Sequence, residues 1–140
     1  MKIQKILLLI TLTVLIMGNS NSLIFLDKIL DKFEWKKRVL LLITNEEDIS
    51  LIQGVDSFFK KGVCQNESRN IELYKIIGNE ISKYNVPQRY LGKKGIWLIG
   101  YDGQDKSHST DISLLKEIYN IIDKMPLRKR EMTEQNKKCN

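Results

Sequence analysis

Cysteine and histidine are scarce in this chain, and their scarcity excludes several kinds of chemistry. The 140 residues contain two cysteines, Cys64 and Cys139, and one histidine, His108. Two cysteines so far apart form no CxxC redox motif, and they are too few for a cysteine-rich metal site. The histidine lies in the polar run "DKSHST", and we interpret it as a surface residue of a strand. The sequence therefore predicts no catalytic residue, no bound metal and no cofactor.

The chain also lacks an apolar run long enough to cross a membrane. The longest such run, Ile6 to Met17, has 12 residues including threonines, whereas a membrane-spanning helix needs about 20. Lys2 and Lys5 precede it and the small polar stretch "GNSNS" follows it, which is the layout of a secretory signal peptide. We expect residues 1–22 to be this signal and the mature protein to reach the periplasm or the extracellular space. The alternative is an uncleaved N-terminus that tethers the domain to the inner membrane.

A strong charge of one sign is missing from the body of the chain. The formal net charge is +6, yet residues 23–123 contain 15 basic and 15 acidic residues. The excess of the mature chain lies in residues 124–140, with six basic and two acidic residues. This distribution and the predicted export argue against a nucleic-acid partner. We expect the partner to be a protein or an anionic component of the cell envelope, with membrane contact only through an uncleaved signal.

The residues after the signal alternate between helix and strand patterns, with enough chain for one domain. Five consecutive aliphatic residues, Val39 to Ile43, predict a strand that is covered on both faces. We expect Thr44 or Asn45 to cap the helix that follows, with acidic residues in its first turn. The full predicted order is a short amphipathic helix over 23–33, a strand over 39–43, a helix to Phe59, a strand over 70–78, a short helix before Pro87, strands over 95–103 and 104–110, and a helix over 110–125.

Three sequence strings give this order a family resemblance. The stretches "KGIWLIGYDGQDK" and "IIDKMPLRKREM" resemble the two most distinctive motifs of the peroxiredoxin-like P-DUDES domain family, and "WKKRVLLLI" resembles a weaker N-terminal one. That family is a thioredoxin-fold domain of unknown function in exported bacterial and extracellular matrix proteins. The resemblance implies an α/β, thioredoxin-like domain over residues 23–132, with a central mixed sheet of about four strands flanked by helices. Residues 133–140 are then a polar basic tail.

The resemblance implies a thioredoxin-like fold, but the sequence lacks the cysteine that the usual thiol chemistry of this fold requires. Thioredoxin-like enzymes keep a reactive cysteine between the first strand and the next helix, where the helix N-terminus lowers the thiol pKa. That loop reads "TNEED" here and has no cysteine. We therefore expect an exported thioredoxin-fold protein that serves as a binding or structural module of the cell envelope rather than as an enzyme. The alternative is an atypical thiol-dependent oxidoreductase that uses Cys64.

Arginine is the residue type that we single out for binding. The basic tail is either a solvated C-terminus whose first part packs on the domain through Leu127 and Met132, or a contact for an anionic surface. In the second case Arg128 and Arg130, which flank a lysine, suit carboxylate ligands because their guanidinium groups are forked and lysine is not. Arg38 and Arg69 precede the first two strands, and we predict that they join this anion or partner contact. Cys64 and Cys139 form either a disulfide, which an oxidising compartment permits, or a buried Cys64 with an exposed, incidental Cys139.

Overall fold

The predicted elements appear in the predicted order, and the structure adds four short ones that the sequence did not predict. The protein is described here by a computed structural model over residues 22–134 and 139, so the predicted signal residues 1–21 and tail residues 135–138 and 140 lie outside the described part. No helix within the described residues is long and apolar enough to cross a membrane. The elements are β1 (Ile24–Phe25), α2 (Leu26–Asp31), β2 (Arg38–Thr44), α3 (Ile49–Lys61), α4 (Val63–Ser68), β3 (Ile71–Ile77), η1 (Gly78–Lys83), β4 (Tyr84–Asn85), β5 (Gly95–Ile99), β6 (Asp105–Ser109), α5 (Ser113–Asp123) and α6 (Pro126–Glu134). The four that the sequence did not predict are β1, α4, β4 and α6.

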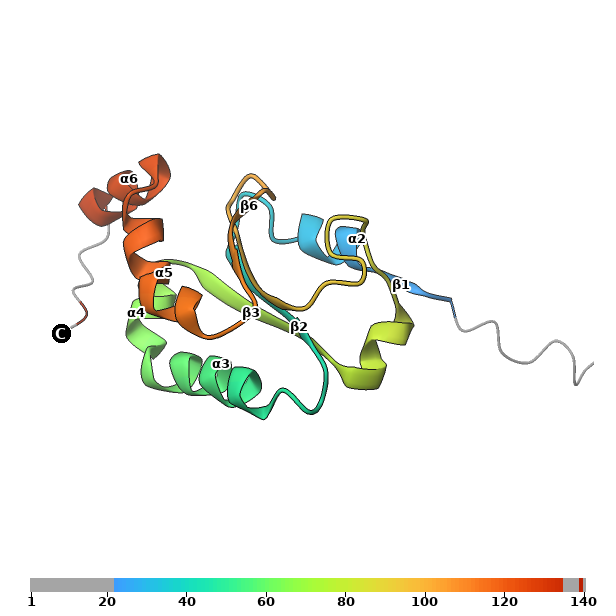
Figure 1. The fold of residues 1–140 in the computed structure, drawn as a ribbon. Helices are drawn as coiled ribbons and strands as arrows, with labels where there is room; N and C mark the ends of the chain where they lie inside the picture. Colours follow the sequence, from blue (N-terminus) through green and yellow to red (C-terminus); the bar gives the residue numbers. More distant parts are fainter. Residues whose placement is uncertain (1–21, 135–138, 140) are drawn as a thin grey trace, which may run out of the picture.

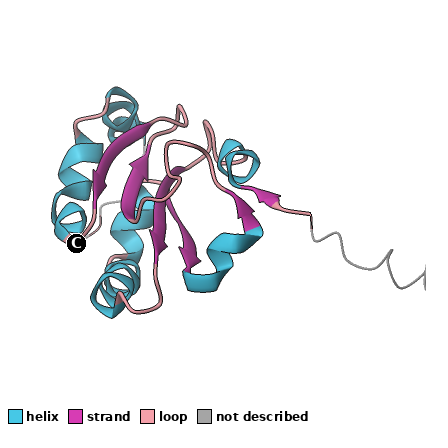
Figure 2. Ribbon diagram, turned by 45° about the vertical axis from the view of Figure 1, so that its right-hand side comes forward, coloured by secondary structure: helices cyan, strands magenta, loops and turns pink. Residues whose placement is uncertain are grey.

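A mixed four-stranded sheet forms the centre of the domain. Its strand order is β3-β2-β5-β6, with β2 parallel to β3 and antiparallel to β5, while β1 and β4 form a separate parallel pair. Figure 2 shows the strands as a twisted layer between helices. All seven residues of β2 are buried, as its continuous apolar run predicts for a strand covered on both faces. The α/β class with a flanked mixed sheet is confirmed, and the arrangement is thioredoxin-like.

The sheet separates two hydrophobic clusters. Because side chains alternate along a strand, Leu40 and Leu42 face one cluster, whereas Leu41 and Ile43 face the other. Helices α3 and α5 cover the first face, and α2 with the segment around Tyr90 covers the second (Figure 1). β2 is therefore the central strand: it pairs with β3 and β5, and its side chains contribute to both hydrophobic clusters.

Several helix boundaries differ from the sequence expectation. The helix predicted over 23–33 runs only from Leu26 to Asp31, because Ile24–Phe25 pair with β4 as a short strand. The prediction that Thr44 or Asn45 caps α3 is wrong, because Thr44 extends β2 and the helix begins only at Ile49. The hydroxyl of Thr44 donates instead to Asp48 Oδ2 at 2.7 Å. At the other end of the domain α5 ends at Asp123 before the proline, as expected, but the chain continues as α6 with Pro126 as its first residue. Proline suits that position because the first helical N–H has no intrahelical partner.

Candidate functional site

Three of the four predicted arginines meet at the end of the sheet where β2 begins. Arg38 is the first residue of β2, and its register partner on the parallel strand β3 is Ile71. Parallel neighbours begin at the same sheet edge, so Arg69, two residues before Ile71, lies next to Arg38. Helix α6 brings Arg128 to the same edge. Exposed fractions of 0% for Arg38, 9% for Arg69 and 6% for Arg128 show that all three are buried, which is rare for arginine without partners.

Asp123 joins two of these arginines. Arg69 grips its carboxylate with two hydrogen bonds, from Nε at 2.9 Å and from Nη2 at 2.7 Å, and Arg128 Nε donates to the same carboxylate at 3.2 Å. Burial opposes ionisation of Asp123, but the hydrogen bonds and charges of the two arginines outweigh it and lower the pKa of this carboxyl. Paired guanidinium–carboxylate contacts of this kind fix the geometry of both partners.

Glu131 joins the third arginine to α6. Arg38 Nη1 lies 3.1 Å from Glu131 Oε2 and also donates to the carbonyl oxygen of Arg69 at 2.7 Å, while Arg128 Nη1 lies 3.6 Å from the same carboxylate oxygen. The hydroxyl of Tyr101 donates to Glu131 Oε1. Burial, together with this hydrogen bond, raises the pKa of Tyr101. Strand β2, the end of β5 and helix α6 are therefore locked together by one polar network.

The network has more positive than negative charge. Arg38, Arg69 and Arg128 face the carboxylates of Asp123 and Glu131, three cations against two anions. The missing negative charge leaves Arg38 without enough acceptors: its Nε and Nη2 are buried without a hydrogen-bond partner among the described residues. The Arg38 guanidinium carbon lies 4.1 Å from the centroid of the Tyr101 ring, which offers a cation–π contact but no acceptor. A buried charge with unused donors is costly, and an anion would offset that cost.

A cavity of about 330 Å³ adjoins this arginine. Trp35, which lines it, is 67% exposed and adopts φ 59°, a left-handed conformation that is an outlier for a bulky residue. The backbone N–H of Trp35 donates to the carbonyl oxygen of Tyr101 at 2.7 Å and holds the turn there. Lys106 adds a second cation to the wall, paired with Asp102 at 2.6 Å. The lining residues are Trp35, Arg38, Gly100, Tyr101, Asp102, Lys106, Met125, Pro126 and Leu127.

This combination suits a ligand with an anionic group and an apolar part. Arg38 supplies the buried cation, Trp35 and Met125 supply apolar and aromatic surface, and the cavity volume is within the range of about 300–1,000 Å³ usual for small-molecule sites. Within residues 22–134 and 139 no group of three or more histidine, cysteine or acidic residues could hold a metal ion. Arg38 and the apolar lining can bind and orient an anion here.

The loop between β2 and α3 lies at the opposite end of β2. Thioredoxin-like enzymes carry their reactive cysteine in this loop, which here has acidic residues instead. Asp48 accepts hydrogen bonds there from Thr44 at 2.7 Å and from Lys94 at 3.2 Å, and these contacts, Thr44 first, lower the pKa of Asp48. Cys64 is far from this loop, on α4 after the other end of α3. It is exposed rather than buried, and it forms a disulfide with Cys139, with 5.8 Å between the two Cα atoms.

The sequence pointed to the basic half of the site and missed the rest. Arg130, the fourth predicted arginine, is exposed on α6 and makes no ion pair within the described residues. Asp123 and Glu131 were not predicted as site residues, although Arg128 and Glu131 stand at the i, i+3 spacing of a helical ion pair. Tyr101 and Lys106 gave no local signal, because only the β5–β6 hairpin brings them to this edge.

Comparisons of the chain with known proteins identify its family. No curated protein and no solved structure matches the chain. A family model described as a domain of unknown function, DUF4174, matches residues 29–131. The match includes Arg38, Arg69, Asp123, Arg128 and Glu131, so the whole arginine network lies inside the family domain. This protein therefore belongs to the DUF4174 family.

Proposed function

We propose that this protein is an exported binding module of the cell envelope that holds a carboxylate-bearing ligand in the cavity beside Arg38. The ligand is a small acid or the acidic group of a larger envelope component or protein. The proposal includes membership of the peroxiredoxin-like P-DUDES family, which the motifs around β5 and α6 suggest. It excludes thiol chemistry at the thioredoxin position, where the loop has no cysteine.

One observation carries the proposal, namely the state of Arg38. Its side chain is fully buried, lines the cavity, and leaves Nε and Nη2 without partners among the described residues. A carboxylate satisfies two parallel guanidinium donors in one planar contact, which a single-point acceptor cannot do. The same carboxylate would supply the negative charge that the network of three arginines and two acids lacks.

Trp35 supports the proposal independently. An exposed tryptophan in a left-handed backbone conformation costs about 1–3 kcal/mol, and glycine would adopt this conformation without strain. Such strain is often kept where a side chain must stand at a ligand site. Trp35 lines the cavity together with Arg38, so its ring would cover the apolar part of the ligand.

The test uses benzoate as the probe and benzamide as its neutral control. Trp35 is exposed and Trp97 is 3% exposed, so quenching of the Trp35 fluorescence reports on the cavity. We expect benzoate to bind and benzamide to bind at least tenfold more weakly. The Lys variant of Arg38 should lose most of the benzoate affinity, since lysine keeps the charge but not the fork. The matched control is Arg130→Lys on the exposed part of α6.

A second variant separates binding from folding. We expect Trp35→Gly to bind benzoate more weakly than the parent, as measured by NMR shifts of the Tyr101 and Asp102 amides. The variant should be at least as stable as the parent. Equal affinity for benzoate and benzamide in the parent, or an unchanged affinity in Arg38→Lys, would contradict the anion site.

Export is tested separately. We expect a full-length fusion to a reporter that is active only after export to be active, and the mature protein to begin after residue 20 or 22. An intact N-terminus on membrane-bound protein would favour the tethered alternative.

The thiol alternative has one observation in its favour, because the Cys64–Cys139 disulfide is exposed at Cys64. A thiol enzyme would lose its activity in Cys64→Ser, and its reduced Cys64 would be alkylated rapidly at neutral pH. A binding module keeps its benzoate affinity in the same variant.

A further inference from the structure

Three consecutive apolar residues near the start of the described chain are exposed. Leu23, Ile24 and Phe25 have exposed fractions of 50%, 42% and 49%. The backbone there is fixed, because Ile24 pairs with Tyr84 and Phe25 with Asn85 on β4. None of the three side chains belongs to either hydrophobic cluster of the domain. We call Leu23, Ile24 and Phe25 the N-terminal patch; neighbouring exposed apolar side chains are typical of contacts with a protein or a membrane.

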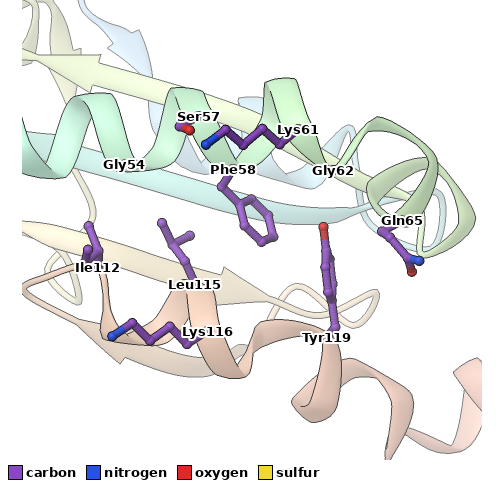
Figure 3. Close-up of a pocket in the computed structure, with 10 residues that line it drawn as sticks. All are labelled: Gly54, Ser57, Phe58, Lys61, Gly62, Gln65, Ile112, Leu115, Lys116 and Tyr119. Carbon is purple, nitrogen blue, oxygen red and sulfur yellow. The ribbon is translucent and has the colours of Figure 1, made fainter. Parts of the chain in front are cut away.

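The groove between α3 and α5 is apolar too, but its side chains are packed. It has a volume of about 520 Å³, and Figure 3 shows Phe58 from α3 and Leu115 and Tyr119 from α5 between the two helices. These side chains pack against the hydrophobic cluster that contains Leu40 and Leu42, and the Phe58 and Tyr119 rings lie 5.1 Å apart, centroid to centroid. The apolar residues of the groove therefore have partners within the domain, whereas those of the N-terminal patch do not.

The shape of the N-terminal patch suits a fluid surface. Figure 1 shows β1 at the end of the domain away from α6, and the turned view of Figure 2 agrees. Because side chains alternate along a strand, Ile24 and Phe25 point to opposite sides of β1. A protein that docks on one side would leave the other side exposed. A lipid bilayer is fluid and can surround the end of the domain, so it covers both sides.

A lysine beside the patch can reach a lipid phosphate. Lys28 on α2 is exposed, and its amine lies 5.1 Å from the centroid of the Phe25 ring. Lysine is suited to a membrane interface, because its stem can lie along apolar surface while its amine stays in water. The neighbouring Asp27 lies 3.6 Å from Arg89, which offsets its negative charge.

The preceding sequence indicates which surface is close to the patch. The predicted signal contains the apolar run Ile6 to Met17, and only residues 18–22 separate this run from Leu23. The six peptide units from Met17 to Leu23 span at most about 22 Å, so the patch stays near any membrane into which the run inserts. A short linker gives an effective concentration on the order of millimolar, and even a weak contact of three side chains is then populated.

We propose that the N-terminal patch inserts into the lipid surface of the membrane across which the chain is exported. The three apolar side chains lie among the headgroups and upper acyl chains, and Lys28 contacts a lipid phosphate. The cavity beside Arg38 is lined partly by α6, which lies away from β1 in Figure 1, so it stays accessible. The proposal rests on the export part of the proposed function and not on the anion site.

The test places a photoreactive side chain in the full chain. p-Benzoylphenylalanine replaces Phe25 in one sample and Ile49, which is 58% exposed on α3, in the matched control. Each chain is reconstituted into vesicles of equal parts phosphatidylethanolamine and phosphatidylglycerol, irradiated and analysed by mass spectrometry. We expect at least fivefold more lipid adduct at position 25 than at position 49. Equal yields at the two positions, or an adduct of position 25 with a second copy of the chain instead of lipid, overturn the proposal.

A pair of apolar variants shows whether the patch itself makes the contact. With the photoreactive group at position 24, Leu23→Ser/Phe25→Ser should lower the yield of lipid adduct at least fivefold. Ile49→Ser/Val63→Ser removes two side chains of similar exposure on α3 and α4, and it should keep the yield of the parent. An equal loss in both double variants would mean that the contact is general hydrophobic attraction, which overturns the proposal.

A pair of charge variants tests the lysine. With the photoreactive group at position 25, Lys28→Glu should lower the yield at least threefold, whereas Lys60→Glu on the exposed side of α3, with the same change in net charge, should not. Equal yields in these two variants overturn the assignment of Lys28. The melting temperature of each variant shows that it is folded. Because the vesicle experiment needs no export and the reporter fusion tests export alone, failure of the lipid contact and failure of export are distinguishable.

Discussion

The two ends of strand β2 use charged residues in opposite ways. At its first residue, Arg38 is buried in a network with Arg69, Arg128, Asp123 and Glu131, and two of its nitrogens lack a partner among the described residues. At its last residue, Thr44 bonds to Asp48, which is paired with an exposed Lys94. Charges in water contribute little to stability, whereas buried charges must be matched. The buried end is therefore where structure and binding depend on the same residues.

The replacement of Arg38 by methionine should have the largest effect on stability, because it removes a buried charge at the first residue of β2. The change removes the partner of Glu131 and the donor to the Arg69 carbonyl, so we expect a loss of about 3–5 kcal/mol in the free energy of unfolding. Denaturant titration measures this loss. Lys94→Met at the other end is the control and should leave the denaturant midpoint unchanged. Equal losses in Arg38→Met and Lys94→Met would show that the buried and the exposed end of β2 contribute equally to stability.

The disulfide ranks second, because it fastens the chain beyond α6 to α4 at the buried end. Cys64→Ser/Cys139→Ser removes a link between residues separated by 75 positions, and we expect it to cost about 2–4 kcal/mol. Denaturant titration of the double variant and of reduced parent protein should give similar values. A parent that is equally stable with and without reductant would show that the bond contributes nothing to this end.

The stability that Asp123 contributes to the buried end of β2 should depend on pH. Its pKa is lowered in the folded protein, so its pairing with Arg69 and Arg128 is complete above the unfolded value of about 3.9 and is lost as the pH falls through the lower folded value. At pH 7 we expect Asp123→Asn to lower the free energy of unfolding by about 1–2 kcal/mol. This cost is smaller than that of breaking a fully buried pair, since the Asp123 side chain is 34% exposed and partly screened by solvent.

Unfolding of the parent and the variant at several pH values checks this account. The difference between them should be constant near neutrality and should shrink below about pH 4. A difference that persists unchanged at low pH would mean that shape, rather than charge, explains the effect of the substitution.

Asp48 should give the smallest effect. Its pKa is lowered too, by Thr44 first and then by Lys94, but the group is exposed to solvent. We expect Asp48→Asn to leave the thermal midpoint within experimental error of the parent at pH 7. A shift as large as that of Asp123→Asn would show that the exposed end also contributes to the stability of β2.

Prediction from the sequence worked best where one physical signal dominated. The apolar run Val39 to Ile43 has no polar face, so it had to become a central strand. The cap of α3 was mispredicted because Thr44 could satisfy either a helix end or the last position of a strand, and tertiary pairing with Ile77 on β3 decided between them. Pro126 marked the end of α5 correctly, but the helix that begins there depends on contacts made by Arg128 and Glu131.

The sequence was enough to predict the main helices and strands in their order, the α/β class and the absence of a cysteine in the loop after β2. These follow from local periodicity and from residue identity, which need no knowledge of distant contacts. It also indicated that Arg38, Arg69 and Arg128 matter. Long-range contacts decided that the three arginines share Asp123 and Glu131, and that Arg38 keeps two donors without partners among the described residues. Charges far apart in the chain become neighbours only when the strands pair and the helices pack.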